Sequence, residues 1–340
     1  LSRRGLDGFR GVQTPSGQSQ GVQRPPGQPS ELRKFRFLSR FFDNPSTTFT
    51  DFHSTNGVQR GDGTPLDACF ERVDRQLSIG AEIQAQLLPD RCPVIEGVDL
   101  AARCRPAFQV GGDYYDFIPT RPELIGRRRE RGRWALVMGD VMGKGVPAGL
   151  LMTMLRGMLR AEVLSGLPPD RILHDLNQLA QEDLAQSHRF VTLFYSDLDP
   201  RTLRLRYANA AHNPPLLWRA ERRVIMRLDA AGLLIGLQPE AEFALGEIRL
   251  EPGDVLLYYT DGVTEAPGIT GDRFDEARLI RALETACRSG QGAQGILESL
   301  FERLDRFVGP DRQLEDDASL VVLKVPEAVT LPSVQGRSIA

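Results

Sequence analysis

Four aspartates in this 340-residue chain each lie beside a short apolar run that has the length and composition of a buried strand. Strands that carry carboxylates at the same edge of a sheet bring those acids together. Two carboxylates about 4 Å apart repel each other by about 4 kcal/mol at an effective dielectric constant of about 20. A group of four therefore needs cations to neutralise it, and all-oxygen ligands favour hard ions such as Mg²⁺ or Mn²⁺. The four acids are Asp113, Asp140, Asp261 and Asp316.

The sequence around each acid is compatible with such a metal centre, although each segment also has a plainer interpretation. Gly111 and Gly112 let the backbone bend and approach a ligand closely, but a glycine-rich turn would have the same sequence. Asp140 ends an apolar run just before the helix that opens at Gly143-Lys144-Gly145, where backbone N–H groups can face a phosphate. A simple strand–turn–helix corner is the alternative there. Carboxylate-lined metal centres commonly act on phosphate.

Other catalytic classes have little support in the sequence. His212 has no second histidine or carboxylate at metal-binding spacing, which favours a turn or hydrogen-bonding residue. No Gly-x-Ser-x-Gly motif of a serine hydrolase is present. The cysteines form no Cys-x-x-Cys pair, which favours buried thiols in a reducing compartment over a zinc site or disulfides.

Composition and charge exclude further classes of protein. The net charge of −3 at pH 7 argues against general binding to nucleic acid or to anionic membranes. No run of 18 apolar residues is present, so we expect no membrane span. The first residues lack the apolar core of a signal peptide. We therefore expect a cytoplasmic protein.

The two ends of the chain differ in composition from its middle. Residues 1–65 are rich in Gly, Pro, Ser and Gln and cannot bury enough apolar surface to fold, which predicts a disordered tail. A second, short tail is predicted over 327–340. Within the first tail, the Phe and Arg residues at 33–42 form either a short amphipathic docking segment or simply an apolar part of the tail.

A helix is predicted over residues 66–88, because Leu66, Phe70, Val73 and Leu77 are spaced by four, three and four residues and Pro89 follows. This helix either packs on its own domain or carries a signal or a dimer contact into the domain that follows. We treat 66–90 as a helical linker or signalling helix.

The segment over 91–326 is predicted to be one domain of alternating strands and helices. The strands include hairpins and the helices come in pairs, which differs from strict strand–helix–strand alternation and favours an α+β fold of two packed, mainly antiparallel sheets with helix pairs outside. Gly111 to Asp116 are interpreted as a connection between two short strands. Predicted strands cover 98–104, 134–138, 190–198, 202–208, 224–228, 243–250, 255–260 and 319–325, and predicted helices cover 146–164, 170–184, 275–288 and 294–308.

Taken in order, six segments resemble the sporulation and stress-response branch of the metal-dependent PP2C-like serine/threonine phosphatases. The resemblance runs from about Phe70 to Val325, roughly three quarters of the chain. Each segment alone is a weak signal, whereas six in the same order are a strong one. The segments are AEIQAQLLP (81–89), VGGDYYD (110–116), GDVMGKGVPA (139–148), ANAAHNPPL (208–216), YTDGVTEA (259–266) and DDAS (316–319).

The resemblance implies an αββα sandwich with two Mn²⁺ or Mg²⁺ ions. Asp140 would bridge both ions, with the Val141 carbonyl as a further ligand. Asp261 and Asp316 would complete the shell of one ion, and Asp113 would hold the other, partly through water. Asp316 is preferred to its neighbour Asp317 because it matches the first acid of the family's pair. A water activated by the ions would attack phosphoserine or phosphothreonine directly, without a phospho-enzyme.

The resemblance also implies partners. Members of this branch often dephosphorylate a phosphoserine on a small anti-anti-sigma protein of the STAS type and so take part in sigma-factor regulation. An upstream sensor or response regulator commonly drives them, and a homodimer is a further expectation. Two other functions stay open: a catalytically inactive signalling scaffold with the same fold, and a metal-dependent nucleotide enzyme such as a cyclase.

Three departures from eukaryotic relatives bear on the chemistry. Met142 stands where those relatives carry a histidine, and Phe108 stands where they carry an arginine that binds phosphate. Phosphate binding would then fall to the metals, with Arg103 or Arg105 as candidates. Ser319 replaces the more usual threonine. The Arg-rich stretch over 121–133 is either solvated surface or a contact for an acidic partner.

Overall fold

The computed structural model describes residues 65–120, 132–310 and 312–327, with side chains from residue 69 onward. These residues belong to one compact unit, Thr64–Ala340. The predicted N-terminal tail up to residue 64, most of the Arg-rich stretch and the C-terminal tail from residue 328 lie outside the described residues.

Two five-stranded sheets form the centre of the fold, and all neighbouring strands within each sheet are antiparallel. The predicted α+β class with two mainly antiparallel sheets is therefore confirmed. The first sheet has the order β1 (Asp99–Arg105), β10 (Ala318–Lys324), β9 (Val255–Tyr259), β6 (Leu216–Arg219) and β7 (Val224–Arg227). The second has the order β2 (Asp113–Pro119), β3 (Trp134–Val141), β4 (Val191–Asp199), β5 (Arg204–Ala210) and β8 (Gly246–Arg249).

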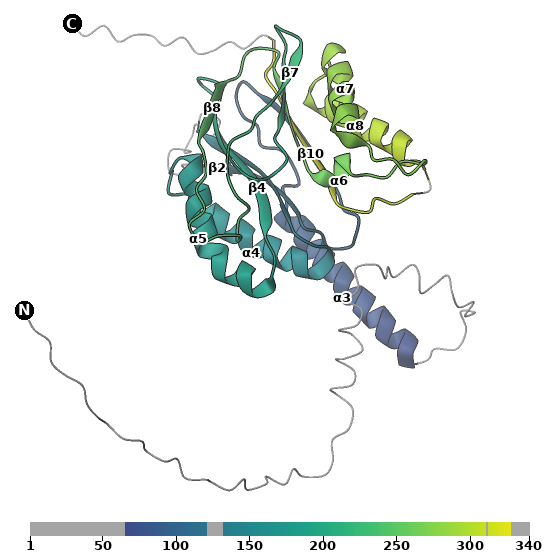
Figure 1. Cartoon of the computed structure of the whole chain (residues 1–340). Coiled ribbons are helices and arrows are strands. Elements are labelled where there is room, and N and C mark those ends of the chain that lie inside the picture. The colour runs from purple at the N-terminus through teal and green to yellow at the C-terminus, as the bar shows by residue number, and fades with distance from the viewer. Residues whose placement is uncertain (1–64, 121–131, 311, 328–340) are drawn as a thin grey trace, which may run out of the picture. The chain divides into compact units, whose positions relative to one another are not determined.

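Two helix pairs cover the outer faces of the sheets, as Figure 1 shows. Helices α4 (Gly145–Val163) and α5 (Pro169–Ser187) pack on the second sheet, and α7 (Asp275–Arg288) and α8 (Ala293–Val308) pack on the first. In α4, Met152, Leu155 and Leu159 recur at helical spacing and are buried against the sheet. The architecture is an αββα sandwich, as predicted.

Alternation along the strands produces three hydrophobic layers. In β3, Ala135 and Val137 face the α4–α5 pair, whereas Leu136 and Met138 face the other sheet. Side chains at successive positions of a strand point to opposite faces, so a strand buried on both sides is apolar throughout. The middle layer packs the two sheets against each other.

Helix α3 (Pro65–Leu87) precedes the sandwich, and its C-terminal half contacts α4. The side chain of Gln84 exchanges two hydrogen bonds with Gly111: its Nε2 donates to the carbonyl at 2.7 Å and its Oε1 accepts the backbone N–H at 2.9 Å. Within the described residues, no helix combines the length and the apolar character needed to cross a bilayer.

Three details differ from the sequence-based expectations. Residues from Asp113 to Asp116 belong to β2 itself and do not connect two strands. Strand β6 was not predicted, because four residues after a Pro-Pro pair are too few to show a period. All four cysteines are free, but Cys69 is exposed and the other three are half-buried, so the expectation of buried thiols is met only in part.

Candidate metal centre

Asp113 and Asp140 face each other directly across two neighbouring strands. Asp113 is the first residue of β2 and its register partner in β3 is Asp140. Directly opposed side chains in an antiparallel pair have Cβ atoms about 5 Å apart. Gly112 permits this approach, because a Cβ at that position would lie 2.7 Å from the Val141 carbonyl oxygen and 3.0 Å from Asp140 Oδ1.

Asp113 is held by two hydroxyl groups from the opposite sheet. Its Oδ2 accepts hydrogen bonds from Thr260 Oγ1 at 2.8 Å and from Ser319 Oγ at 2.6 Å. Thr260 follows β9 and Ser319 lies in β10, so these bonds connect the two sheets at the edge of the sandwich. The Asp113 carboxylate is therefore fixed in position and buried, with an exposure of 4%.

The other acids reach the same edge from the first sheet. Asp261 lies two residues after the end of β9 and opens the short helix α6 (Asp261–Thr264), and Asp316 and Asp317 directly precede β10. Gly262 lets these segments meet, since a Cβ there would lie 2.0 Å from the Asp317 carbonyl oxygen. Because β9 ends where its antiparallel neighbour β10 begins, acids distant in sequence become neighbours.

Asp317 has a different environment from Asp316. Its Oδ1 accepts the backbone N–H of Ala107 at 2.8 Å and its Oδ2 accepts that of Gly112 at 2.9 Å. Asp317 is buried, whereas the Asp316 side chain is 43% exposed. The backbone bonds occupy the Asp317 carboxylate and tie the β10 entry to the Gly111–Gly112 turn, so Asp317 serves as a structural clamp that the sequence did not predict.

Burial and mutual repulsion raise the pKa values of Asp113, Asp140 and Asp261. Burial is the main cause for Asp140, and the charges of Asp261, Asp316 and Asp317 add to it, so that its pKa rises from 3.8 to about 8. Burial followed by the charges of Asp140 and Asp317 raises the pKa of Asp113 well above its usual value. Burial and the charge of Asp316 likewise raise the pKa of Asp261. The four predicted acids are thus brought together, and each lies in the electrostatic field of others.

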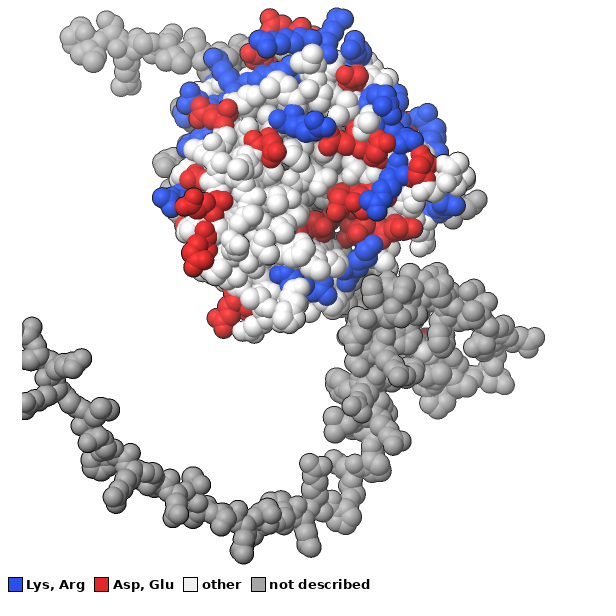
Figure 2. All heavy atoms as spheres, in the orientation of Figure 1, with Lys and Arg blue, Asp and Glu red and all other residues white. Residues whose placement is uncertain are grey.

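Figure 2 shows a dense group of acidic side chains toward the right of the visible face, where α6 and the start of β10 lie in Figure 1, with Lys and Arg side chains at its border. Within the described ranges, no group of three or more His, Cys, Asp or Glu side chains is placed to hold a metal ion. The donor set nevertheless fits a hard divalent cation. It is made of carboxylates with a backbone carbonyl beside them, the oxygen ligands that such ions prefer.

Two cations proposed from the sequence for phosphate binding are directed elsewhere. Arg105 pairs with Asp305 on α8, and the Arg103 and Arg105 guanidinium groups lie 5.4 and 4.2 Å from the centre of the Phe301 ring. Both arginines therefore pack on α8 and are not available at the acids.

His212 is a buried hydrogen-bonding residue, as its sequence context predicted. Its Nδ1 lies 2.9 Å from Thr192 Oγ1, and its backbone N–H donates to Asn209 Oδ1 at 2.9 Å. Burial lowers the pKa of the imidazole to about 4, so the ring is neutral at pH 7. His212 fixes the turn after β5 and contributes no side-chain ligand to the acid cluster.

An αββα sandwich with aspartates gathered at one edge of both sheets defines the class of PP2C-like protein serine/threonine phosphatases. The fold matches the solved SiaA-PP2C domain of Pseudomonas aeruginosa with a TM-score of 0.64 and 22% identity, over 76% of this chain and 98% of that one. Residues 130–326, more than half of the chain, match the family model of Stage II sporulation protein E (SpoIIE). The chain therefore belongs to the SpoIIE family.

Relatives in this family are similar over most of the described domain. The phosphoserine phosphatase RsbU of Bacillus subtilis is 29% identical over 256 residues, which are 75% of this chain and 71% of that protein. Protein IcfG of Synechocystis is 27% identical over 275 residues, but this chain spans only 41% of its length. Among solved structures, the RsbU and RsbW domains of a Mycobacterium tuberculosis protein match with a TM-score of 0.58 and 26% identity, over 71% of this chain and 64% of that one.

Proposed function

We propose that this protein hydrolyses phosphoserine on a protein substrate and uses two Mn²⁺ or Mg²⁺ ions to do so. The observation that carries the proposal is the convergence of Asp113, Asp140, Asp261 and Asp316 at one edge of the sandwich, where burial and repulsion raise the pKa of Asp140 to about 8. Such a cluster is costly for the fold unless cations bind to it. The fold and family of the chain support the phosphatase class.

The ligand roles expected from the sequence remain the best assignment. Asp140 would contact both ions, with the Val141 carbonyl, Asp261 and Asp316 on one of them and Asp113 on the other. The occupied lone pairs of Asp317 support the preference for Asp316, because a carboxylate that already accepts two backbone N–H bonds is a poorer ligand. Metal binding would require the exposed Asp316 side chain to turn toward Asp140 and Asp261.

Bound ions of this kind lower the pKa of water and offset the charge of a phosphoryl group. The residues of the chain would position the ligands of these ions. Thr260 and Ser319 keep Asp113 in one orientation, and Gly112 keeps the Asp140 carboxylate and the Val141 carbonyl accessible. Met142 supplies no proton at the position next to the cluster, so the serine leaving group would take its proton from solvent.

We further propose that the substrate is a phosphorylated anti-anti-sigma protein of the STAS type. The support comes from relatives: RsbU is named a phosphoserine phosphatase, and a mycobacterial structure combines RsbU and RsbW domains. The proposal includes a cytoplasmic location and regulation by an upstream sensor or response regulator. Helix α3 would transmit that signal or form a homodimer, because Gln84 links it to Gly111, two residues before Asp113.

The test is hydrolysis of p-nitrophenyl phosphate and of a phosphorylated STAS protein, with and without Mn²⁺. The wild type is compared with Asp140→Asn and Asp261→Asn, and Asp199→Asn in the β4–β5 hairpin serves as a matched control far from the cluster. We expect activity that needs Mn²⁺, is lost in both cluster variants and persists in the control. Mn²⁺ binding without hydrolysis of either substrate would favour a non-catalytic signalling scaffold.

A further inference from the structure

Lys144 is the cation that pairs with the acid cluster within the described part of the chain. Its Nζ lies 3.1 Å from Asp316 Oδ2 and also donates a hydrogen bond to the Glu315 carbonyl oxygen. Within the residues that the structure describes, no other Lys or Arg forms a salt bridge with any of the five clustered aspartates. Arg189, the neighbouring arginine, donates instead to the Met142 carbonyl oxygen.

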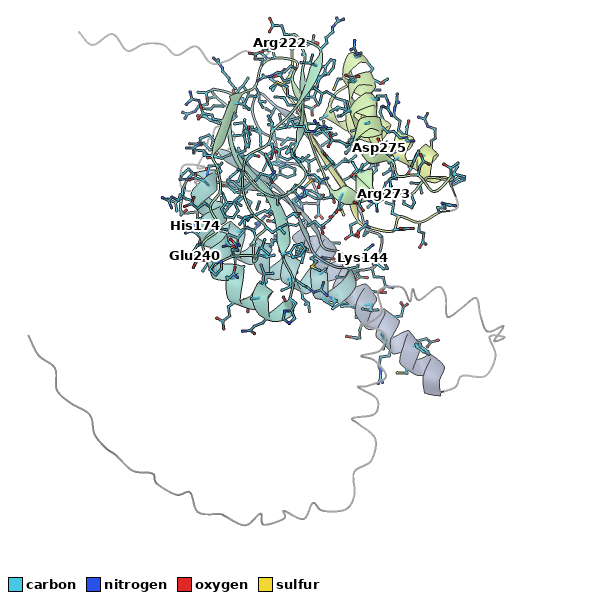
Figure 3. All side chains as sticks on the ribbon, in the orientation of Figure 1. Lys144, His174, Arg222, Glu240, Arg273 and Asp275 are labelled. Carbon is cyan, nitrogen blue, oxygen red and sulfur yellow. The ribbon has the colours of Figure 1, made fainter. Side chains whose placement is uncertain are left out.

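The Lys144 side chain is open to solvent and lies beside an aromatic ring. The side chain is 44% exposed, so an incoming group can reach the ammonium. The Phe108 ring lies on one side of it, with its centre 5.8 Å from Nζ. Gly143 and Gly145 flank Lys144 with φ angles of 101° and 69°, a backbone conformation that glycine adopts without strain. Figure 3 labels Lys144 at the start of α4.

The start of α4 adds to this positive potential. Lys144 is the N-cap residue of a 19-residue helix that has no side-chain cap and no acidic residue in its first turn. Uncapped N–H groups and the helix dipole favour an anion at this end. A phosphate ester is a dianion, and the clustered aspartates repel it. Its binding therefore needs positive charge in addition to that of the metal ions held by the aspartates.

We propose that Lys144 binds the phosphate of the substrate and thereby supplies the cation that Arg103 and Arg105 do not. This inference rests on the proposed phosphatase function, and it assigns a substrate contact within that site. An ammonium group is a compact charge on a flexible stem, so it can leave Asp316 and turn toward a phosphate oxygen without movement of the backbone.

The test is calorimetric titration of inorganic phosphate into the Mn²⁺-loaded protein, which needs no turnover. Three variants are compared with the wild type: Lys144→Met, Lys144→Arg, and Lys324→Met as a charge-matched control at the end of β10, where Lys324 bonds to the Gln291 carbonyl. A hydrogen bond to a charged group contributes about 1.5–3 kcal/mol, so Lys144→Met should weaken phosphate binding by about 10- to 100-fold. Lys144→Arg should retain most of the affinity and the control all of it.

A second titration, of Mn²⁺ into the metal-free proteins, separates phosphate binding from metal binding. Removal of the ammonium beside Asp316 should leave Mn²⁺ affinity unchanged or raise it. Unchanged phosphate affinity in Lys144→Met, or a parallel loss of Mn²⁺ affinity, would overturn the inference, since the second result would mean that Lys144 only positions Asp316. A wild type that binds Mn²⁺ and phosphate but hydrolyses no phosphoserine would overturn the proposed activity alone.

Discussion

Asp317 Oδ2 accepts the backbone N–H of Gly112 at 2.9 Å, and this bond joins residues 205 positions apart in the chain. Asp317 precedes β10 of the first sheet, and Gly112 precedes β2 of the second. The second oxygen of the same carboxylate accepts the N–H of Ala107. One side chain therefore fixes the edge of the sandwich at which the other four aspartates meet.

Asp317→Ala should destabilise the metal-free protein by about 2–4 kcal/mol, because the backbone N–H groups of Ala107 and Gly112 would lose their partner. Asp316→Ala is the matched control next to it. Its exposed carboxylate pairs with Lys144 in solvent, so its loss should cost less than about 1 kcal/mol. Urea unfolding of both variants measures the difference, and equal effects would contradict the clamp assigned to Asp317.

Gly112→Ala should impair Mn²⁺ binding while the fold persists. A Cβ at this position would lie 2.7 Å from the Val141 carbonyl oxygen, a distance that forces the strand edge to shift. Gly157→Ala is the control, because a Cβ there meets nothing within 4 Å. Within helix α4 that change should add about 1 kcal/mol of stability. Calorimetry with Mn²⁺ and circular dichroism test both variants, and normal Mn²⁺ affinity in Gly112→Ala would show that the turn tolerates a side chain.

The sequence predicted the helices well because their apolar periods are long. Helix α7 covers Asp275–Arg288 as expected, and α8 starts one residue earlier than predicted. Strand β6 was missed because four residues carry no measurable period. The interpretation of Gly111 to Asp116 as a connection between two short strands was wrong. Strand β2 begins directly at Asp113, and the two glycines before it suggested that the whole segment was a loop.

The candidate site was predicted in part. Each of the four acids stands beside an apolar strand, which is a local signal, and the structure brings them to one edge. The functions of Asp317 and Gln84 depend on which backbone groups lie opposite them, at separations of 205 and 27 residues, and no local pattern encodes this. The sequence around Lys144 gave a partial indication of an anion site, since this residue stands between two glycines at a helix start. Its contact with Asp316 is visible only in the structure.

His212 should destabilise the fold on the acid side of neutrality. Burial lowers the pKa of the imidazole from 6.5 to about 4, so the unfolded chain binds a proton more readily than the folded one in this range. The contribution of His212 to stability should therefore fall as the pH drops from 6.5 toward 4, by about 3 kcal/mol in total. His212→Gln should lose this dependence. His188→Asn, at the exposed C-cap of α5, should keep it, and an unchanged pH profile in His212→Gln would rule out the buried neutral imidazole.

Asp140 should change stability with pH in the opposite direction to His212, over a range that extends to higher pH. Its pKa rises from 3.8 in the unfolded chain to about 8 in the fold, so the folded state binds the proton more readily. The contribution of Asp140 to the stability of the metal-free protein should therefore fall as the pH rises from about 4 to 8, and Asp140→Asn should remove this contribution. Saturating Mn²⁺ should reverse the trend in the wild type, because ions that bind the deprotonated cluster stabilise the fold by mass action. Unfolding curves at pH 5 and pH 8, with and without Mn²⁺, compare the two proteins, which share the contribution of His212. A stability difference between metal-free wild type and Asp140→Asn that is the same at pH 8 as at pH 5 would contradict the raised pKa of Asp140.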